Sequence, residues 1–122
     1  MSRDVLSVPP DTTVAAAAKS MSGGRVGAVV VLEDNQLRGI LTERDVLRAV
    51  AEGRVETSTV AQLMTPQPET IEPTESTGTA ATLMIHGGFR HLPVVDEGRV
   101  IGIVSIRDLM RFVLDDTAPR GV

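Results

Sequence analysis

The chain has 122 residues, a net charge of −4 and a hydrophobic content of 42%. That content is enough to build a core, so the chain as a whole is not expected to be disordered. Its basic residues are dispersed among acidic ones, and only Phe89 and Phe112 are aromatic. Proteins that bind DNA or RNA use a clustered basic surface and often stack bases on aromatic side chains. We therefore expect no nucleic-acid partner.

Three further features of the sequence bear on location. The absence of cysteine excludes disulfides and thiol chemistry and suits a reducing cytoplasm. The longest apolar runs, such as 26–32, are far shorter than the roughly 20 residues that span a bilayer, and the polar start at 1–4 lacks the apolar stretch of a secretion signal. Arginine supplies nearly all of the basic residues, as in proteins of GC-rich bacterial genomes. We expect a bacterial, cytoplasmic protein with no membrane partner.

The chain contains two copies of one unit. Shifting the sequence by 63 positions aligns residues 1–50 with 64–113 without a gap, and thirteen aligned positions are identical. A gapless register of this length indicates an internal duplication. One unit of about 50 residues buries too little surface to be stable alone. We expect the two copies to pack through their sheets about a pseudo-twofold axis and to form one core.

Each copy is predicted to form a βαββα unit, which makes the chain an α+β protein. In chain order, the first copy should begin with an extended segment at 6–8 and a helix that is capped by Asp11 or Thr12 and ends at Gly23 and Gly24. Strands at 28–32 and 37–41 should follow, joined by a turn at Asp34 and Asn35. A helix from Glu43 to Gly53 should close the copy. The buried stripe of its first helix is predicted to be Val14, Ala17, Ala18 and Met21.

The second copy repeats this pattern. It should contain an extended segment at Thr70 and Ile71, a helix capped by Thr74 and ended by Gly87 and Gly88, strands at 92–95 and 100–104 joined at Glu97 and Gly98, and a helix from Ile106. The buried stripe of its first helix is predicted to be Ala80, Ala81, Met84 and Ile85. The closing helices of both copies carry apolar residues along one face, at Val46, Leu47 and Val50 and at Leu109, Met110 and Val113.

The segment between the copies is polar and contains proline, with a helical turn predicted at 60–64. We therefore divide the chain into a first repeat at 1–53, a linker with a short helical lead-in at 54–68, a second repeat at 69–114 and a C-terminal tail at 115–122.

Both hairpins end in the same short motif, at 39–45 and 102–108, where a glycine, two apolar residues and a hydroxyl residue precede an aspartate three positions further on. A strand gives way to a helix here. The free N–H groups and the dipole of the helix suit a phosphate, and the hydroxyl of Thr42 or Ser105 can add a hydrogen bond to it. The carboxylate of Asp45 or Asp108 can accept hydrogen bonds from both vicinal hydroxyls of a ribose.

Two interpretations of this motif stay open. Thr42 and Ser105 can be plain N-caps, with Asp45 and Asp108 as first-turn acids that the helix dipole favours. Recurrence of the motif at equivalent places, each with its glycine, favours a ligand site. Recurrence is also what shared ancestry of the two copies would leave behind.

The doubled unit resembles the cystathionine-β-synthase (CBS) domain pair, or Bateman module. The resemblance rests on the two motifs, on Phe-Arg-His-Leu-Pro-Val-Val-Asp at 89–96 and on the lead-in Val-Ala-Gln-Leu-Met-Thr at 60–65, and it covers the chain up to 114. It implies two related clefts between the copies and dimerisation with another pair. It also implies adenosine-type ligands such as AMP, ADP, ATP or S-adenosylmethionine, with no cofactor required.

The resemblance also implies roles for single residues. Asp45 and Asp108 would hold ribose, and Thr42 and Ser105 would approach phosphate. Two basic residues before the step to Pro93, Arg90 and His91, would be phosphate ligands. Their counterparts in the first copy, Gly27 and Ala28, carry no charge, which argues against equal occupancy of the two clefts. Adenine would rest on backbone and apolar groups around Val8, Val26, Ile71 and Phe89.

Other polar residues are interpreted more plainly. His86 and His91 have no cysteine or carboxylate cluster beside them in the sequence, so a zinc or catalytic role is disfavoured. Arg90 can also be a solvated surface residue. The arginines that recur on the closing helices are interpreted as ion-paired exposed residues or a dimer contact rather than ligand groups: Arg44, Arg48, Arg107 and Arg111.

Two functions remain in consideration. The first is a regulatory module that binds an adenosine-type ligand between the copies and passes a change in their packing to an unknown effector protein. The second is a ligand-independent dimerisation or interaction module with vestigial clefts. An enzyme is disfavoured, because the sequence has no acid–base carboxylate pair, nucleophile–His–acid set, metal cluster or phosphate-binding loop.

Overall fold

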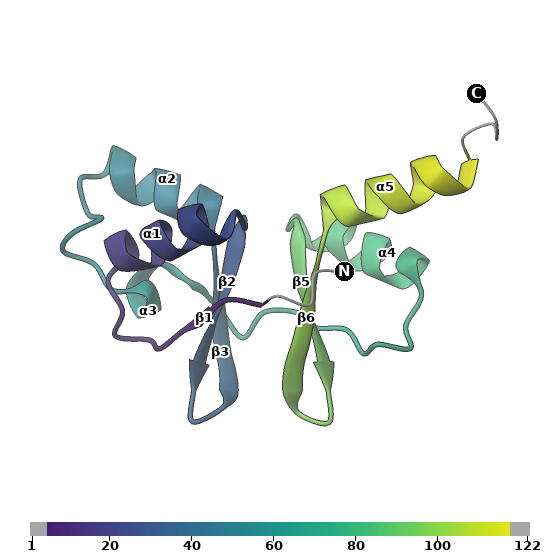
Figure 1. Ribbon diagram of the computed structural model, residues 1–122, viewed down its shortest axis with the longest axis horizontal. Coiled ribbons are helices and arrows are strands. Elements are labelled where there is room, and N and C mark those ends of the chain that lie inside the picture. The colour runs from purple at the N-terminus through teal and green to yellow at the C-terminus, as the bar shows by residue number, and fades with distance from the viewer. Residues whose placement is uncertain (1–4, 118–122) are drawn as a thin grey trace.

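The computed structural model describes residues 5–117, with side chains up to Arg111. The chain forms two lobes that lie side by side, one for each copy, and the hairpins of both lobes point in the same direction (Figure 1). Strand β3 of the first lobe contacts strand β6 of the second, so the lobes meet through their sheets. The α+β class and the tandem arrangement of two βαββα units are thereby confirmed.

The first lobe is built on a four-stranded sheet in the order β1-β2-β3-β4. Strand β1 (Ser7–Val8) runs parallel to β2 (Ala28–Glu33), which forms an antiparallel hairpin with β3 (Gln36–Thr42). Helices α1 (Val14–Gly24) and α2 (Glu43–Ala51) contact this sheet and each other. The β-branched run of β2 suits a strand that is buried on both faces, and it is buried from Ala28 to Val31.

The second lobe repeats the βαββα unit of the first, and its hairpin has the same register shift. It consists of helix α4 (Thr77–Gly87), the hairpin of β5 (His91–Asp96) and β6 (Arg99–Ser105), and helix α5 (Ile106–Thr117). A parallel bridge joins Ile71 to Val94, as β1 joins Val8 to Val31. The register of the hairpin shifts after Val94, as it does after Val31. The duplication therefore extends to backbone detail.

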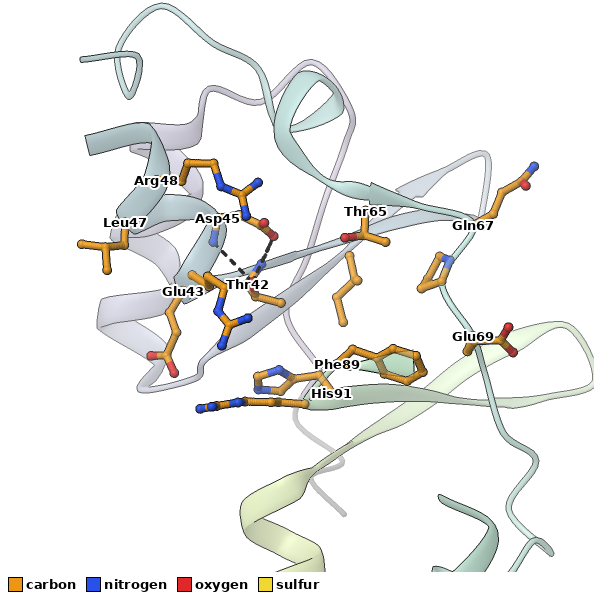
Figure 2. Close-up of a pocket in the computed structure, with 15 residues that line it drawn as sticks. Thr42, Glu43, Asp45, Leu47, Arg48, Thr65, Gln67, Glu69, Phe89 and His91 are labelled. Atoms are coloured by element: carbon orange, nitrogen blue, oxygen red, sulfur yellow. Dashed lines mark hydrogen bonds between the residues drawn. The ribbon is translucent and has the colours of Figure 1, made fainter. Parts of the chain in front are cut away.

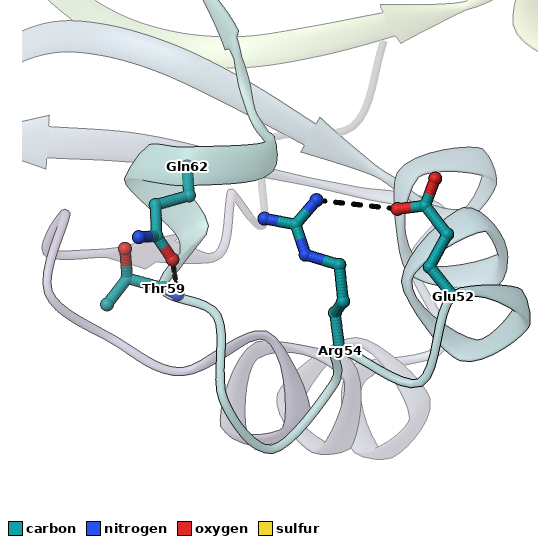
Figure 3. Close-up of polar contacts among 4 residues, drawn as sticks. All are labelled: Glu52, Arg54, Thr59 and Gln62. Atoms are coloured by element: carbon teal, nitrogen blue, oxygen red, sulfur yellow. Dashed lines mark hydrogen bonds and ion pairs between the residues drawn. The ribbon is translucent and has the colours of Figure 1, made fainter.

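The segment between the copies packs into the first lobe. Its helix α3 (Val60–Leu63) matches the predicted helical turn, and Val60 is fully buried in the first lobe's core. Strand β4 (Thr65–Pro66), which the sequence did not predict, pairs with β3. Polar contacts hold the loop before α3 (Figure 3): Arg54 Nη1 lies 3.4 Å from Glu52 Oε1, and the Thr59 N–H donates to Gln62 Oε1 at 2.9 Å.

The expectation of one core is wrong, because each lobe has its own hydrophobic cluster between sheet and helices. The first cluster contains Val29, Val31 and Leu41, and the second contains Leu92 and Val94 among others. Alternation along a strand turns the next residues to the opposite face. A further set of buried residues therefore lies on the opposite faces, where β3 contacts β6, and includes Ala28, Val30, Ile40, Pro93 and Ile103.

The helix ends differ from prediction by one or two residues. The N-caps are Thr13 and Ser76, whose hydroxyls accept from the N–H of Ala16 and Thr79, rather than Asp11, Thr12 or Thr74. The left-handed C-cap of α1 is Arg25 (φ 56°), and its counterpart in α4 is Gly88 (φ 73°). Two consecutive glycines stand near the end of each helix, so the sequence did not show which residue adopts the left-handed conformation.

Apolar residues on three helices are more exposed than their spacing suggests. Ile85, assigned to the buried stripe of α4, is 72% exposed because the stripe follows Ala80 and Met84 instead. Leu47 of α2 and Met110 of α5, at equivalent positions, are 68% and 58% exposed. Helices α2 and α5 therefore each present an apolar side chain to solvent.

Gly39 should not tolerate a side chain, because β3 and the segment at 64–65 approach closely there. An added Cβ would lie 2.8 Å from the Thr65 carbonyl oxygen and would overlap Met64 Sδ. We expect Gly39→Ala to lower the free energy of unfolding by about 2 kcal/mol through backbone displacement. The control Gly23→Ala adds a Cβ in open space within α1 and should stabilise by about 0.5–1 kcal/mol. Urea unfolding measures both, and a Gly39→Ala variant as stable as Gly23→Ala would contradict the close approach.

Candidate functional site

Two cavities lie where the two lobes meet. The first has a volume of about 780 Å³ and contains Asp45 in its wall; we call it the Asp45 cavity. The second has a volume of about 580 Å³ and contains Asp108; we call it the Asp108 cavity. Both volumes lie in the range of cavities that enclose small-molecule ligands.

The two cavities are counterparts of one another under the 63-residue shift. Each is bordered by the start of a closing helix from one copy and by the loop before the first hairpin strand of the other copy, 88–91 or 25–28. Among the equivalent pairs that line them, five keep the same or a similar side chain: Ile40 and Ile103, Thr42 and Ser105, Arg44 and Arg107, Asp45 and Asp108, and Arg48 and Arg111. Figure 2 shows Thr42, Asp45 and Arg48 on one side of the Asp45 cavity, with Phe89 and His91 on the other. A molecule in either cavity therefore contacts both copies.

In the first copy the aspartate of the motif caps its own helix. Asp45 Oδ2 accepts from the Thr42 N–H at 2.9 Å and from Thr42 Oγ1 at 3.0 Å, and the Asp45 N–H donates to Thr42 Oγ1 at 3.4 Å. Asp45 is 8% exposed, although it lines the cavity. These bonds use only Oδ2. The cap therefore fixes the carboxylate, and its second oxygen remains for another donor.

The second copy builds the same arrangement with serine. Asp108 Oδ2 accepts from the Ser105 N–H at 2.9 Å, and the Asp108 N–H donates to Ser105 Oγ at 3.0 Å. The capping interpretation of the motif thus holds in both copies. It is compatible with a ligand role, because the cap uses only Oδ2 of each carboxylate and both aspartates line a cavity.

The helix N-termini are less available to phosphate than the sequence suggested. The Glu43 N–H donates to the Gly27 carbonyl at 2.9 Å, and the Ile106 N–H donates to the Arg90 carbonyl at 2.8 Å. The Asp45 and Asp108 N–H groups are taken by the cap. The side chains around the cavities are therefore more available to an anion than these four backbone N–H groups are.

The arginines of the closing helices are charged side chains of this kind. The sequence interpretation treated them as ion-paired exposed residues or a dimer contact and not as ligand groups. Arg44 and Arg48 line the Asp45 cavity, and their counterparts Arg107 and Arg111 line the Asp108 cavity. Among the side chains that the structure describes, ion pairs join Arg38 to Glu33 and Arg54 to Glu52, and none involves these four arginines. Their recurrence in both copies was the signal that could have assigned them to the site. Other cavity residues without an assigned role include Arg25, Glu43, Gln67 and Glu69.

The remaining expected site residues divide into two groups. Phe89 lines the Asp45 cavity and Val26 the Asp108 cavity, at equivalent positions. Val8 and Ile71 instead belong to the hydrophobic clusters of their lobes, and Pro93 is buried within β5. The walls of the two cavities do not include these three residues. The contact of Val8 and Ile71 with adenine, and a ligand role for Pro93, stay predictions.

Arg90, His91 and Glu43 border both cavities. A Cβ added to Gly27 would lie 3.3 Å from Glu43 Oε1 and 3.4 Å from His91 Nε2, so both side chains reach the same place. Burial lowers the pKa of His91 from its ordinary value of 6.5. The carboxylates of Glu43 and Asp108 act in the opposite direction, and Arg90 lowers the pKa further.

The described residues contain no group of three or more side chains that could hold a metal ion. No helix in that part of the chain is long and apolar enough to cross a membrane.

The family model of the CBS domain matches residues 1–52 and again 60–115. The chain belongs to the CBS-domain family. An uncharacterised 17.7 kDa protein of Acidianus ambivalens is 42% identical to this CBS pair over 111 residues. The alignment covers 88% of this chain and 66% of that protein, so the chain spans just under two thirds of the relative's length.

Solved CBS structures are similar along nearly the whole chain. The CBS domain protein PAE2072 of Pyrobaculum aerophilum, solved with AMP, is 30% identical, with a TM-score of 0.85 over 97% of this chain and 94% of that one. The CBS domain pair of protein MJ0100, solved with 5′-methylthioadenosine and S-adenosyl-L-methionine, is 25% identical, with a TM-score of 0.84 over 92% and 93%.

We expect the His91 imidazole of this CBS pair to titrate below pH 6.5 in a proton NMR pH series. Replacing Arg90 by Gln should raise the midpoint, and replacing Glu43 by Gln should lower it, because the first removes a repelling cation and the second an attracting anion. The unfolded state takes up this proton at higher pH than the folded state does. The contribution of His91 to stability is therefore complete above about pH 6.5 and shrinks as pH falls through the folded pKa. A midpoint above 6.5 would contradict its burial.

Proposed function

We propose that this CBS pair is a regulatory module that binds adenosine-type ligands, such as AMP, ADP, ATP or S-adenosylmethionine, in the two cavities between its copies. The observation that carries the proposal is the repeated placement of a capped aspartate and two arginines at the wall of each cavity. The ligands in the solved complexes of PAE2072 and MJ0100 support the same class of compound.

The chemistry of the walls fits the parts of such a ligand. Oδ1 of Asp45 or Asp108 can accept from ribose hydroxyls while Oδ2 remains in the cap. Arg44 and Arg48, or their counterparts, can pair with a phosphate through planar guanidinium groups. Apolar groups such as Ile40 and Phe89 offer a surface for the base in the Asp45 cavity.

A regulatory role follows because both copies contribute residues to the wall of each cavity. Because the walls come from both copies, a ligand binds best to one relative position of the two lobes and shifts the population toward it. A partner that contacts both lobes can respond to that shift. We propose that this partner is an effector protein and that the module works as a homodimer of CBS pairs. No enzymatic step is proposed.

The exposed apolar residues favour a second candidate function, a ligand-independent dimerisation or interaction module. Leu47 on α2 and Met110 on α5 occupy equivalent positions and present large apolar side chains to solvent, beside Val50 on α2. Such residues are enriched where helices pair with a partner. The two functions are compatible, since a dimer can carry functional cavities.

Isothermal titration with AMP, ADP, ATP and S-adenosylmethionine tests ligand binding. The double variant Asp45→Asn/Asp108→Asn keeps an oxygen for each cap but replaces the ribose-facing oxygen with an amide NH₂. We expect it to weaken binding by about tenfold or more, because a charge-assisted bond contributes roughly 1.5–3 kcal/mol. Asp34→Asn, in an exposed hairpin turn, is the control. No heat from any ligand at millimolar concentration would rule out the proposal.

Light scattering with and without nucleotide tests the dimer. The variant Val50→Glu/Met110→Glu places a charge at one exposed apolar position on each of α2 and α5, neither of which lines a cavity, and should shift the dimer to monomer while leaving the fold intact. If the protein is a dimer only with nucleotide bound, the ligand-independent function fails. A variant that remains dimeric would remove α2 and α5 from the interface.

A further inference from the structure

The two cavities share their aspartate, hydroxyl and two arginines but differ in the residues around them. The Asp45 cavity has Glu69 where the Asp108 cavity has Leu6, and it has Gly88 where the Asp108 cavity has Arg25. Both differences make the Asp108 cavity more positive than the Asp45 cavity. Arg90, Glu43 and His91 border both cavities and do not distinguish them.

The two cavities therefore differ in the number of charged side chains of each sign. Three arginines and three carboxylates line the Asp45 cavity, whereas four arginines and two carboxylates line the Asp108 cavity. Glu69 lies across the Asp45 cavity from Asp45 (Figure 2), so carboxylates border that cavity on two sides. A cleft lined by an excess of one sign attracts ligands of the opposite sign. The Asp108 cavity therefore favours an anion, and the Asp45 cavity does not.

The Asp45 cavity, which has the less positive wall, has larger apolar side chains. Phe89, Leu47 and Pro68 line the Asp45 cavity, and Val26 stands where Phe89 does in the other. An aromatic ring and a larger volume suit a ligand with more apolar surface. A 5′ substituent without charge can contact such a wall without losing the hydration that a phosphate requires.

We propose that the two cavities divide adenosine-type ligands by the charge at the 5′ position. The Asp108 cavity takes a 5′-phosphorylated adenosine such as AMP, and Arg25 and Arg107 hold the phosphate. The Asp45 cavity takes an adenosine whose 5′ group is uncharged or cationic, such as a thioether or a sulfonium. This division rests on the proposed function, since it assigns ligands to the same two cavities.

The test is titration of the full chain with AMP and with 5′-methylthioadenosine. Asp108→Asn should weaken AMP by about tenfold or more and leave 5′-methylthioadenosine within about twofold, and Asp45→Asn should do the reverse. Arg25→Gly installs the residue that the second copy has at this left-handed position, so it keeps the helix cap. It should weaken AMP alone. Raising the salt concentration should weaken AMP more than 5′-methylthioadenosine.

The opposite exchange adds a gain of binding. Glu69→Leu installs the residue of the first copy, removes a carboxylate from the Asp45 cavity and should add a second AMP site to the stoichiometry. If AMP and 5′-methylthioadenosine both bind but respond to the same aspartate variant, or if Arg25→Gly leaves AMP unchanged, the division is wrong while the proposed function stands. If neither ligand binds, the division is wrong, and the proposed function fails with it when ADP, ATP and S-adenosylmethionine give no heat either.

Discussion

The structure depends on the packing of two copies of one unit through their sheets. Neither copy completes a cavity by itself: the start of α2 faces residues 88–91 of the other copy, and the start of α5 faces residues 25–28. The buried residues between the sheets, among them Val30, Ile40 and Ile103, hold these edges in place. A cleft formed in this way is sensitive to any change in the angle between the copies. Ligand binding and lobe position are therefore thermodynamically linked.

The second constraint is the cap at the start of each closing helix. One oxygen of Asp45 or Asp108 satisfies the backbone N–H of the hydroxyl residue, which fixes the side chain against the helix. The carboxylate therefore needs little ordering when a ligand arrives. Fixed acceptors of this kind lose less entropy on binding than a mobile side chain does. Capping and ligand binding are thus two uses of one carboxylate rather than competing explanations.

The sequence alone was enough to predict the repeat, the order of elements and the strand-to-helix motifs, because the duplication compares two copies position by position. It could not show that Val8 and Ile71 pack into the lobe cores, since an apolar residue beside a cleft and one beneath it have the same pattern. The sequence interpretation also assigned Arg44 and Arg107 to ion-paired exposed residues or a dimer contact. Their recurrence in both copies was a sequence signal for the site, and the arrangement of the two copies shows that they line the cavities. Strand β4 was missed because two residues carry no periodicity.

The most direct test of the central claim is a crystal structure of the protein grown with saturating AMP. The account predicts nucleotide density in a cavity between the copies, with a ribose hydroxyl within hydrogen-bond distance of the free carboxylate oxygen of Asp45 or Asp108 and with contacts to both lobes. Nucleotide bound elsewhere, or a ribose that avoids both carboxylates, would contradict it. Two empty cavities at saturating nucleotide would contradict it as well.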